Sequence, residues 1–192
     1  MRKGAELRDE ILSAARAEFA RHGLAGARID RVVKESRASR ERLYAHFGDK
    51  ETLFREVVAA DAAHFFTAVV PRPEALAEFV GDIYDLALAH PEHLRMITWA
   101  RLEGLELFAP DADMIPTSGA AVVAAAQAGG HADAAWQPDE LIVMLFAIGL
   151  SWATSPDPQL QTDDPATIAR RRAAAVEAAA RVIEPRTGRR PG

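Results

Sequence analysis

Cysteine is missing from this sequence, and so are several other patterns that carry chemistry. The chain of 192 residues has no cysteine, which excludes disulfide frameworks, thiolate zinc sites, iron–sulfur clusters and cysteine nucleophiles. It also lacks a glycine-rich phosphate loop and any strand-like alternation of useful length. Hydrophobic residues make up 49% and charged residues 27% of the chain, so its composition is that of a globular protein and not of a disordered one.

Long apolar runs are scarce as well. The longest nearly uncharged run covers residues 141–153, which is shorter than the roughly 20 residues that a membrane-spanning helix needs. Residues 1–19 are charged throughout and lack the apolar core of a secretory signal. We therefore expect a cytoplasmic chain without membrane contact, in which residues 141–153 form a buried core or interface helix.

Charge is divided unevenly along the chain. The formal net charge is −5 overall. Residues 1–55 nevertheless hold 13 basic and 9 acidic residues, whereas residues 56–192 hold 10 basic and 19 acidic ones. This asymmetry indicates that the N-terminal part binds a polyanion and that the rest of the chain does not.

Apolar residues recur with a helical period, so the predicted fold class is all-α. In the N-terminal part the pattern predicts helices over residues 6–22, 28–35 and 40–47, then a longer helix from Asp49 to before Pro71. Further helices are expected near residues 76–90, 94–108, 120–128, 138–154 and 165–183, with turns at 109–116 and a loop at 128–138.

Residues 27–53 are the most informative segment. Two short helices separated by residues 36–38 have the proportions of a helix-turn-helix, whose second helix enters the DNA major groove. Ser39 is a good N-cap for this second helix. Leu43 and Phe47 lie four residues apart and would face the core, which leaves Glu41, Arg42 and Ala45 on the outer face.

The outer face carries groups that DNA can bind. Arg40 and Arg42 are candidates for guanine O6 and N7, and Glu41 can accept from cytosine N4. Arginines in the first turn oppose the helix dipole at a cost of roughly 0.3 to 1 kcal/mol each, which a bound phosphate backbone would offset. The candidates for phosphate contacts are Tyr44, His46 and Lys50. A solvent-exposed charged helix in any small bundle would show the same pattern without binding DNA.

The same segment resembles a known family. The stretch ILSAARAEFARHGLAGARIDRVVKESRASRERLYAHFGDKETLF, over about residues 7–54, resembles the DNA-binding domain of TetR-family transcriptional regulators. The matching residues are Phe19, Gly23, Ser39, Leu43, Tyr44, His46, Phe47, Lys50, Glu51 and Leu53. The resemblance implies a three-helix DNA-binding head, a connecting fourth helix and a larger helical domain for ligand binding and homodimerisation. It also implies that Tyr44 and Lys50 contact phosphates and that residues 39–45 form the recognition segment.

The sequence departs from the family pattern in two places, the turn at residues 36–38 and Arg28. Ser36, Arg37 and Ala38 stand where the family usually has Ala-Gly-Val, and a non-glycine residue in a left-handed turn costs on the order of 1 kcal/mol. Arg28 stands where a threonine often caps the second helix, although it could still contact a phosphate. The irregular turn motivates the alternative function, a helical dimeric adaptor that has lost specific DNA binding.

The expected organisation has three parts. Residues 1–48 form the helix-turn-helix DNA-binding domain, and residues 49–184 form the ligand-binding and dimerisation domain, with the helix 49–70 connecting the two. Residues 185–192 are expected to be a disordered tail. The homodimer is expected to form through the helices at about 139–154 and 165–183, because the former is apolar on nearly all faces and the latter offers an alanine stripe.

Aromatic residues and methionines suggest a small-molecule pocket in the C-terminal part. The candidate ligand-binding residues are Tyr84, His93, Met96, Trp99, Glu103, Phe146 and Trp152. Residues of these types at helical spacing are also ordinary core residues. Trp99 and Glu103 are four residues apart, so a lipophilic cation could meet both. We expect an apolar or aromatic effector and not a phosphorylated one.

No cofactor, metal or catalytic residue is expected. His90, Glu92 and His93 suggest a metal site, but Pro91 breaks the helix between them, so a role at the helix end or on the surface is the favoured interpretation. Ser118 and Ser151 lack the G-x-S-x-G context of a nucleophile, so the chain is not expected to be an enzyme. The predicted function is a ligand-responsive transcriptional repressor released from a pseudo-palindromic DNA operator.

Overall fold

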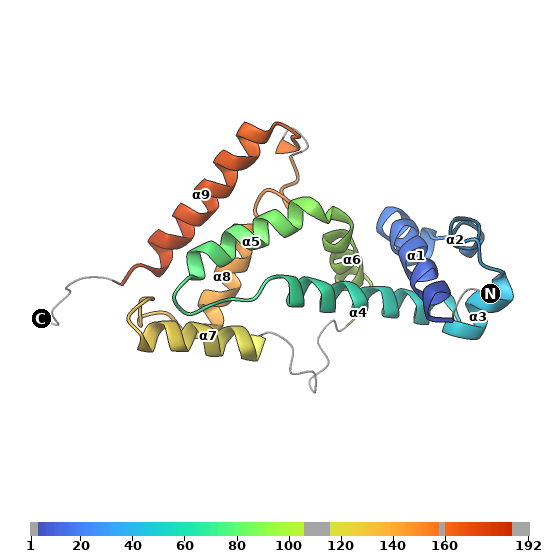
Figure 1. Ribbon diagram of the computed structural model, residues 1–192, viewed down its shortest axis with the longest axis horizontal. Helices are drawn as coiled ribbons and strands as arrows, with labels where there is room; N and C mark the ends of the chain where they lie inside the picture. Colours follow the sequence, from blue (N-terminus) through green and yellow to red (C-terminus); the bar gives the residue numbers. More distant parts are fainter. Residues whose placement is uncertain (1–3, 106–115, 158–159, 186–192) are drawn as a thin grey trace, which may run out of the picture. The chain divides into compact units, whose positions relative to one another are not determined.

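The computed structural model describes residues 4–105, 116–157 and 160–185, and all regular structure within these ranges is helical (Figure 1). Contacts divide the chain into two compact units. Unit 1 comprises residues 1–65 and 90–109, and unit 2 comprises residues 66–89 and 110–192. The predicted turns at 109–116 and the predicted tail at 185–192 lie almost entirely outside the described residues.

Each unit is a bundle of helices. The helices that begin in unit 1 are α1 (Gly4–Gly26), α2 (Ile29–Ser36), α3 (Arg40–Phe47), α4 (Lys50–Ala68) and α6 (Pro91–Leu102). Those of unit 2 are α5 (Leu76–Ala89), α7 (Pro116–Ala128), α8 (Pro138–Leu150) and α9 (Pro165–Ile183). The units differ from the expected domains 1–48 and 49–184, because α6 packs with α1 in unit 1.

The core of unit 1 joins α1, α3, α4 and α6. Phe19 and Phe54 meet edge to face with ring centroids 5.0 Å apart, and both side chains are fully buried. Leu43 of α3 and Met96 of α6 belong to the same cluster and are also fully buried. This cluster holds α3 against the other helices through one face of α3 only.

Gly23 interrupts α1. Its φ of 65° and ψ of −178° are not helical, so α1 is two helical pieces that run on to Gly26. The predicted helix end at Gly23 therefore coincides with a break in α1, but the continuation of the helix to Gly26 was not predicted. The break brings the chain against α6, where Trp99 Nε1 donates a hydrogen bond to the carbonyl of Ala20 at 3.2 Å.

In unit 2, α9 packs along α5, and α8 packs against both (Figure 1). Arg172 of α9 pairs with three carboxylates of α5, those of Glu78, Asp82 and Asp85, at 3.6, 3.5 and 2.7 Å. These acidic residues are spaced by three and four positions, so they share one face of α5. The side chain of Arg172 therefore links the two helices along that face.

Two predicted helices end earlier than expected. The predicted helix at 94–108 begins at Pro91 and ends at Leu102, because Gly104 adopts φ 69° and the N–H of Leu105 turns back to the carbonyl of Ala100. The predicted helix at 138–154 ends at Leu150 and continues only as turns. Within the described residues, no helix is long and apolar enough to cross a membrane.

Candidate nucleic-acid interface

The second helix of the helix-turn-helix, α3, forms as the sequence predicts. The Ser39 side chain accepts a hydrogen bond from the N–H of Arg42 at 3.2 Å, and Gly48 ends the helix with φ 73°. Leu43 and Phe47 are buried, at 0% and 2% exposure. The amphipathic pattern of eight residues thus suffices to place one face in the core and the other in solvent.

All predicted DNA-contacting residues of α3 lie in solvent. The exposed residues are Ser39, Arg40, Glu41, Arg42, Tyr44, Ala45 and His46. Arg40 pairs with Asp30 of α2, so this guanidinium must leave Asp30, or share it, to reach a base. The Arg42 guanidinium makes no ion pair within the described part of the chain, and the backbone N–H of Arg42 donates to the Ser39 cap.

The turn between α2 and α3 has a regular left-handed residue in spite of its unusual sequence. Arg37 adopts φ 53° and ψ 25°, and it is the only non-glycine residue with positive φ in the described part of the chain. Ser36 is buried and donates its hydroxyl to the carbonyl of Val32 at 2.8 Å. The turn therefore does contain a non-glycine residue in the left-handed conformation, as the sequence suggested, and Arg37 bears the strain.

Arg28 does not cap α2 with its side chain, in line with the departure seen in the sequence. Its backbone N–H instead donates to the Glu18 carboxylate of α1 at 2.9 Å, and the same oxygen accepts from Arg31 at 3.2 Å. The Glu18 carboxylate thus binds the N–H of the N-cap residue itself, whereas a threonine at this position would accept from an N–H inside the first turn of α2. The exposed Arg28 side chain is left to face solvent.

Lys50 and Asp49 lie where α4 begins. Asp49 accepts a hydrogen bond from the N–H of Thr52 at 2.7 Å, and this bond holds the pKa of the carboxyl below its usual value. Lys50 Nζ donates to the carbonyl of Ala27 at 3.4 Å, which leaves two of its three donors for a phosphate. Asp49 therefore caps the first turn of α4, which begins at the position where the sequence predicts this helix.

The seven candidate ligand-binding residues are divided between the two units. Met96 is fully buried in the core of unit 1, and Trp99 packs against the same core. Glu103 is an exposed residue at the C-terminal end of α6. The ordinary core interpretation therefore describes Met96 and Trp99.

The other aromatic candidates pair within unit 2. Tyr84 of α5 and Trp152 meet edge to face with ring centroids 5.7 Å apart, and Phe146 of α8 meets Phe79 in the same way at 5.4 Å. Tyr84 is buried, and burial raises the pKa of its hydroxyl. Phe146 and Trp152 are half-buried, so their rings can still be reached.

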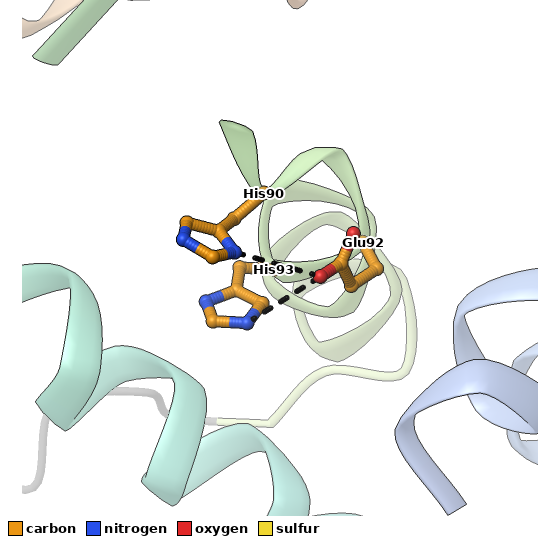
Figure 2. A group of neighbouring side chains, drawn as sticks. All are labelled: His90, Glu92 and His93. Atoms are coloured by element: carbon orange, nitrogen blue, oxygen red, sulfur yellow. Dashed lines mark ion pairs between the residues drawn. The ribbon is translucent and has the colours of Figure 1, made fainter. Parts of the chain in front are cut away.

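His90, Glu92 and His93 converge at the start of α6, contrary to the expectation that the helix break keeps them apart (Figure 2). His90 is the N-cap residue, but its side chain makes no capping hydrogen bond. His93 is buried and not on the surface, and burial lowers the pKa of its imidazole. The predicted place at the helix end or on the surface therefore holds for His90, whose side chain is 40% exposed, and is wrong for the buried His93.

A buried ion pair lies next to this group. Arg16 of α1 donates to Asp61 of α4 at 2.6 Å, and the Asp61 side chain is fully buried. Burial raises the pKa of Asp61, although the Arg16 guanidinium acts in the opposite direction. Asp61 also interacts electrostatically with His93. Nothing in the sequence pattern indicated this contact, because the residues belong to three different helices.

Comparison with known proteins agrees with the helix-turn-helix architecture described above. The family described as "Bacterial regulatory proteins, tetR family" matches residues 11–57, and "Tetracyclin repressor-like, C-terminal domain" matches residues 75–181. Together the two matches include α3 and most of unit 2. The chain belongs to the TetR family.

Several relatives carry functional names. The HTH-type transcriptional repressor SCO4008 of Streptomyces coelicolor is 42% identical over 96 residues, which are 50% of this chain and 48% of that protein. The HTH-type transcriptional repressor NicS of Pseudomonas putida is 31% identical over 102 residues, with the same shares of the two chains. The chain thus spans about half the length of the curated relatives it matches.

Solved structures extend the similarity to nearly the whole chain. A crystal structure of SCO4942 from Streptomyces coelicolor, described as a transcriptional regulator, is 36% identical with a TM-score of 0.82. The match covers 92% of this chain and 97% of that one. A tetR-family regulatory protein from Rhodococcus RHA1 shares the fold at 18% identity, with a TM-score of 0.73 and coverage of 94% and 98%.

Proposed function

We propose that the chain is a homodimeric transcriptional repressor that binds a pseudo-palindromic DNA operator through α3. The observation that carries this proposal is the outer face of α3, where Glu41, Arg42 and Ala45 lie in solvent opposite the buried Leu43 and Phe47. The basic excess of residues 1–55 supports it. The names of SCO4008 and NicS support repression as the outcome.

The geometry of the operator follows from two-fold symmetry. Two α3 helices of a dimer would enter successive major grooves roughly 34–36 Å apart. Arg42 and Glu41 would then read base edges, while Tyr44, His46 and Lys50 position the head on phosphates. Arg40 would form its ion pair with Asp30 in the free protein and contact DNA in the complex.

Two substitutions separate base reading from phosphate binding. We expect Arg42→Ala to weaken operator binding by about 1–3 kcal/mol and to relax the preference at one base step. Lys50→Ala should instead weaken binding to all sequences alike and reduce the salt slope by about one counterion. Gel-shift titrations at several salt concentrations, with the intergenic DNA beside the gene and with scrambled DNA, measure both effects.

Arg181→Ala is the matched control for these variants. Arg181 lies in α9 of unit 2 and is highly exposed, with a partner, Glu177, one turn away. Its removal deletes one arginine without touching α3, so operator affinity should stay at the wild-type level. If Arg42→Ala and Lys50→Ala also keep wild-type affinity and sequence preference, then α3 is not the recognition helix and the adaptor function is favoured.

Unit 2 is proposed to bind the effector, a small apolar or aromatic molecule. Tyr84, Phe146 and Trp152 provide aromatic surface there, in part still exposed. Neither α5 nor α8 contains a lysine or arginine. In α9, Arg172 is engaged by three carboxylates of α5, and Arg171, the arginine that acts on Tyr84, donates to the carbonyl of Leu160. A phosphorylated ligand would need a free arginine cluster or a glycine-rich helix start. An effector that binds preferentially to a dimer conformation in which the two α3 helices do not match the groove spacing of the operator would release the dimer from DNA.

Tryptophan fluorescence tests the effector proposal. We expect an apolar or cationic aromatic compound to change the emission of Trp152 and to release operator DNA, whereas nucleotides and sugar phosphates do neither. Trp152→Phe should remove the fluorescence response, and Trp136→Phe should retain it, because Trp136 Nε1 is bound to the carbonyl of Val182. Release of DNA by a nucleotide alone, without any response to apolar compounds, would contradict the proposal.

A further inference from the structure

His90, Glu92 and His93 form a group of ligand atoms that the proposed function leaves unused. One nitrogen or oxygen from each residue lies within 4.8 Å of those from the other two. Figure 2 shows the two imidazole rings side by side, with the Glu92 carboxylate opposite them. Glu92 Oε1 is 3.8 Å from His90 Nδ1 and 3.8 Å from His93 Nε2. We propose that these three residues bind a divalent transition-metal ion, with Zn²⁺ as the best match.

The backbone at the start of α6 creates this arrangement. His90 has φ −133° and ψ 62°, which is outside the helical region, so the residue turns back over the first turn of the helix. Its ring stacks on that of His93, with centroids 4.9 Å apart and planes at 26°. Pro91 occupies the first helical position, where it loses no hydrogen bond. The proline therefore brings His90 over His93 and does not separate them.

The separations suit an ion after small movements. Zinc bonds of about 2.0–2.2 Å at tetrahedral angles place neighbouring ligand atoms about 3.4 Å apart. The two separations of 3.8 Å need to shorten by about 0.4 Å, and the separation of the two histidine ligand atoms, which is within 4.8 Å, needs the larger adjustment. His90 and Glu92 can move because their side chains are 40% and 41% exposed. Two histidines and one glutamate also leave a fourth position for water or another ligand.

His93 gives a second and independent indication. Its side chain is buried to more than nine-tenths, yet its Nδ1 has no hydrogen-bond partner. The neighbouring Asp61 is equally buried, and its Oδ2 also has no partner, while Oδ1 accepts from Arg16. A metal-bound histidine usually donates its other N–H to a carboxylate or carbonyl. An ion bound at His93 Nε2 would leave the proton on Nδ1, which would donate to Asp61 Oδ2. Asp61 would then orient the His93 ring.

The surroundings favour a transition metal over Mg²⁺ or Ca²⁺. His64 of α4 places a third imidazole ring 5.4 Å from that of His90 and 5.1 Å from that of His93. Imidazole nitrogens suit Zn²⁺, Ni²⁺ and Cu²⁺, whereas Mg²⁺ and Ca²⁺ prefer sets of oxygen ligands. All of these residues belong to unit 1.

Calorimetric titration of the full chain, without a polyhistidine tag, tests the proposal. With Zn²⁺ alone we expect one ion per chain, and with Mg²⁺ alone no comparable binding. Glu92→Gln and His90→Asn should each weaken Zn²⁺ binding by at least about tenfold. Both positions are well exposed, so circular dichroism should show unchanged folding. Co²⁺ in place of Zn²⁺ should give visible absorption that changes in both variants.

His22→Ala is the matched control. His22 Nε2 lies 3.8 Å from Glu18 Oε2, the same separation as in the proposed site, but among the described residues no third metal-ligating side chain joins this pair. We therefore expect wild-type zinc affinity in this variant. Absence of zinc binding in the wild type would overturn the proposal, and so would binding that persists in Glu92→Gln and His90→Asn. The test uses no DNA, so its result is independent of the proposed repressor function.

Discussion

Gly23→Ala is expected to destabilise the protein by about 3 kcal/mol, the sum of backbone strain and a displaced aromatic ring. Gly23 combines φ 65° with ψ −178°, a region that is essentially restricted to glycine. A Cβ at this position would lie 2.8 Å from Cζ3 of Trp99 and 2.9 Å from its Cε3. The ring cannot move away freely, because Trp99 Nε1 donates to the carbonyl of Ala20. Thermal denaturation should show a midpoint lower by roughly 6–12 °C.

Substitutions at two other glycines separate the contribution of backbone strain from that of the displaced Trp99 ring. Gly104 has φ 69° but no atom within 4 Å of a built Cβ, so Gly104→Ala measures strain alone. Gly26 lies in the same helix as Gly23 without a positive φ, and its nearest contact is His22 Cβ at an ordinary 3.4 Å. We expect Gly26→Ala to be nearly neutral. Equal losses of stability in Gly23→Ala and Gly104→Ala would show that the Trp99 ring contributes nothing to the effect.

The helix α3 could be predicted from sequence because its determinants are local. Ser39 and Gly48 mark the two ends of α3, and Leu43 with Phe47 identifies its buried face. Each of these signals acts within one or two turns of chain. The same holds for Asp49, whose capping bond to Thr52 is three residues long. Local signals of this kind also explain why the outer face of α3 was identified correctly.

Contacts between distant segments could not be predicted in the same way. An apolar residue on a helix indicates burial, but it does not indicate which element covers it. Trp99 was therefore a candidate for a ligand pocket, whereas in the structure it covers Gly23 of α1. The convergence of His90 with His93 was missed for a different reason. Pro91 was interpreted as a break that separates them, and the N-cap geometry of His90 is visible only in three dimensions.

The alanine stripe of α9 shows the same limit. Ala175 and Ala179 were expected to face a symmetric partner, but they are 1% and 0% exposed within the single chain. Since α9 packs along α5, their small side chains allow the two helices of one subunit to approach closely. A charge at Ala179 would therefore damage the fold of unit 2 and could not report on a dimer. The assignment of the buried stripe to the dimer interface was wrong.

The apolar face that remains for a partner lies on α8. Leu141, Ile142 and Leu145 are buried within unit 2, whereas Val143 is 66% exposed. Ala147, one turn further along, is exposed as well, so the two form an outward apolar stripe on a helix whose only charged residues, Asp139 and Glu140, lie in its first turn. TetR-family regulators are typically dimers, and we propose that this stripe of α8, with the outer side of α9, is the dimer interface of this chain.

Val143→Glu is expected to weaken the dimer by about 100-fold or more. A two-fold interface contains the substitution twice, and each unpaired buried polar group costs roughly 1–3 kcal/mol, with more for a charge. Sedimentation velocity over a range of concentrations measures the dissociation, and operator binding should fall in parallel because one head contacts only one half-site. Leu102→Glu is the control, since Leu102 is equally apolar and 69% exposed but lies in α6 of unit 1. A Val143→Glu protein that sediments as an unchanged dimer, or a Leu102→Glu protein that dissociates instead, would move the interface away from α8.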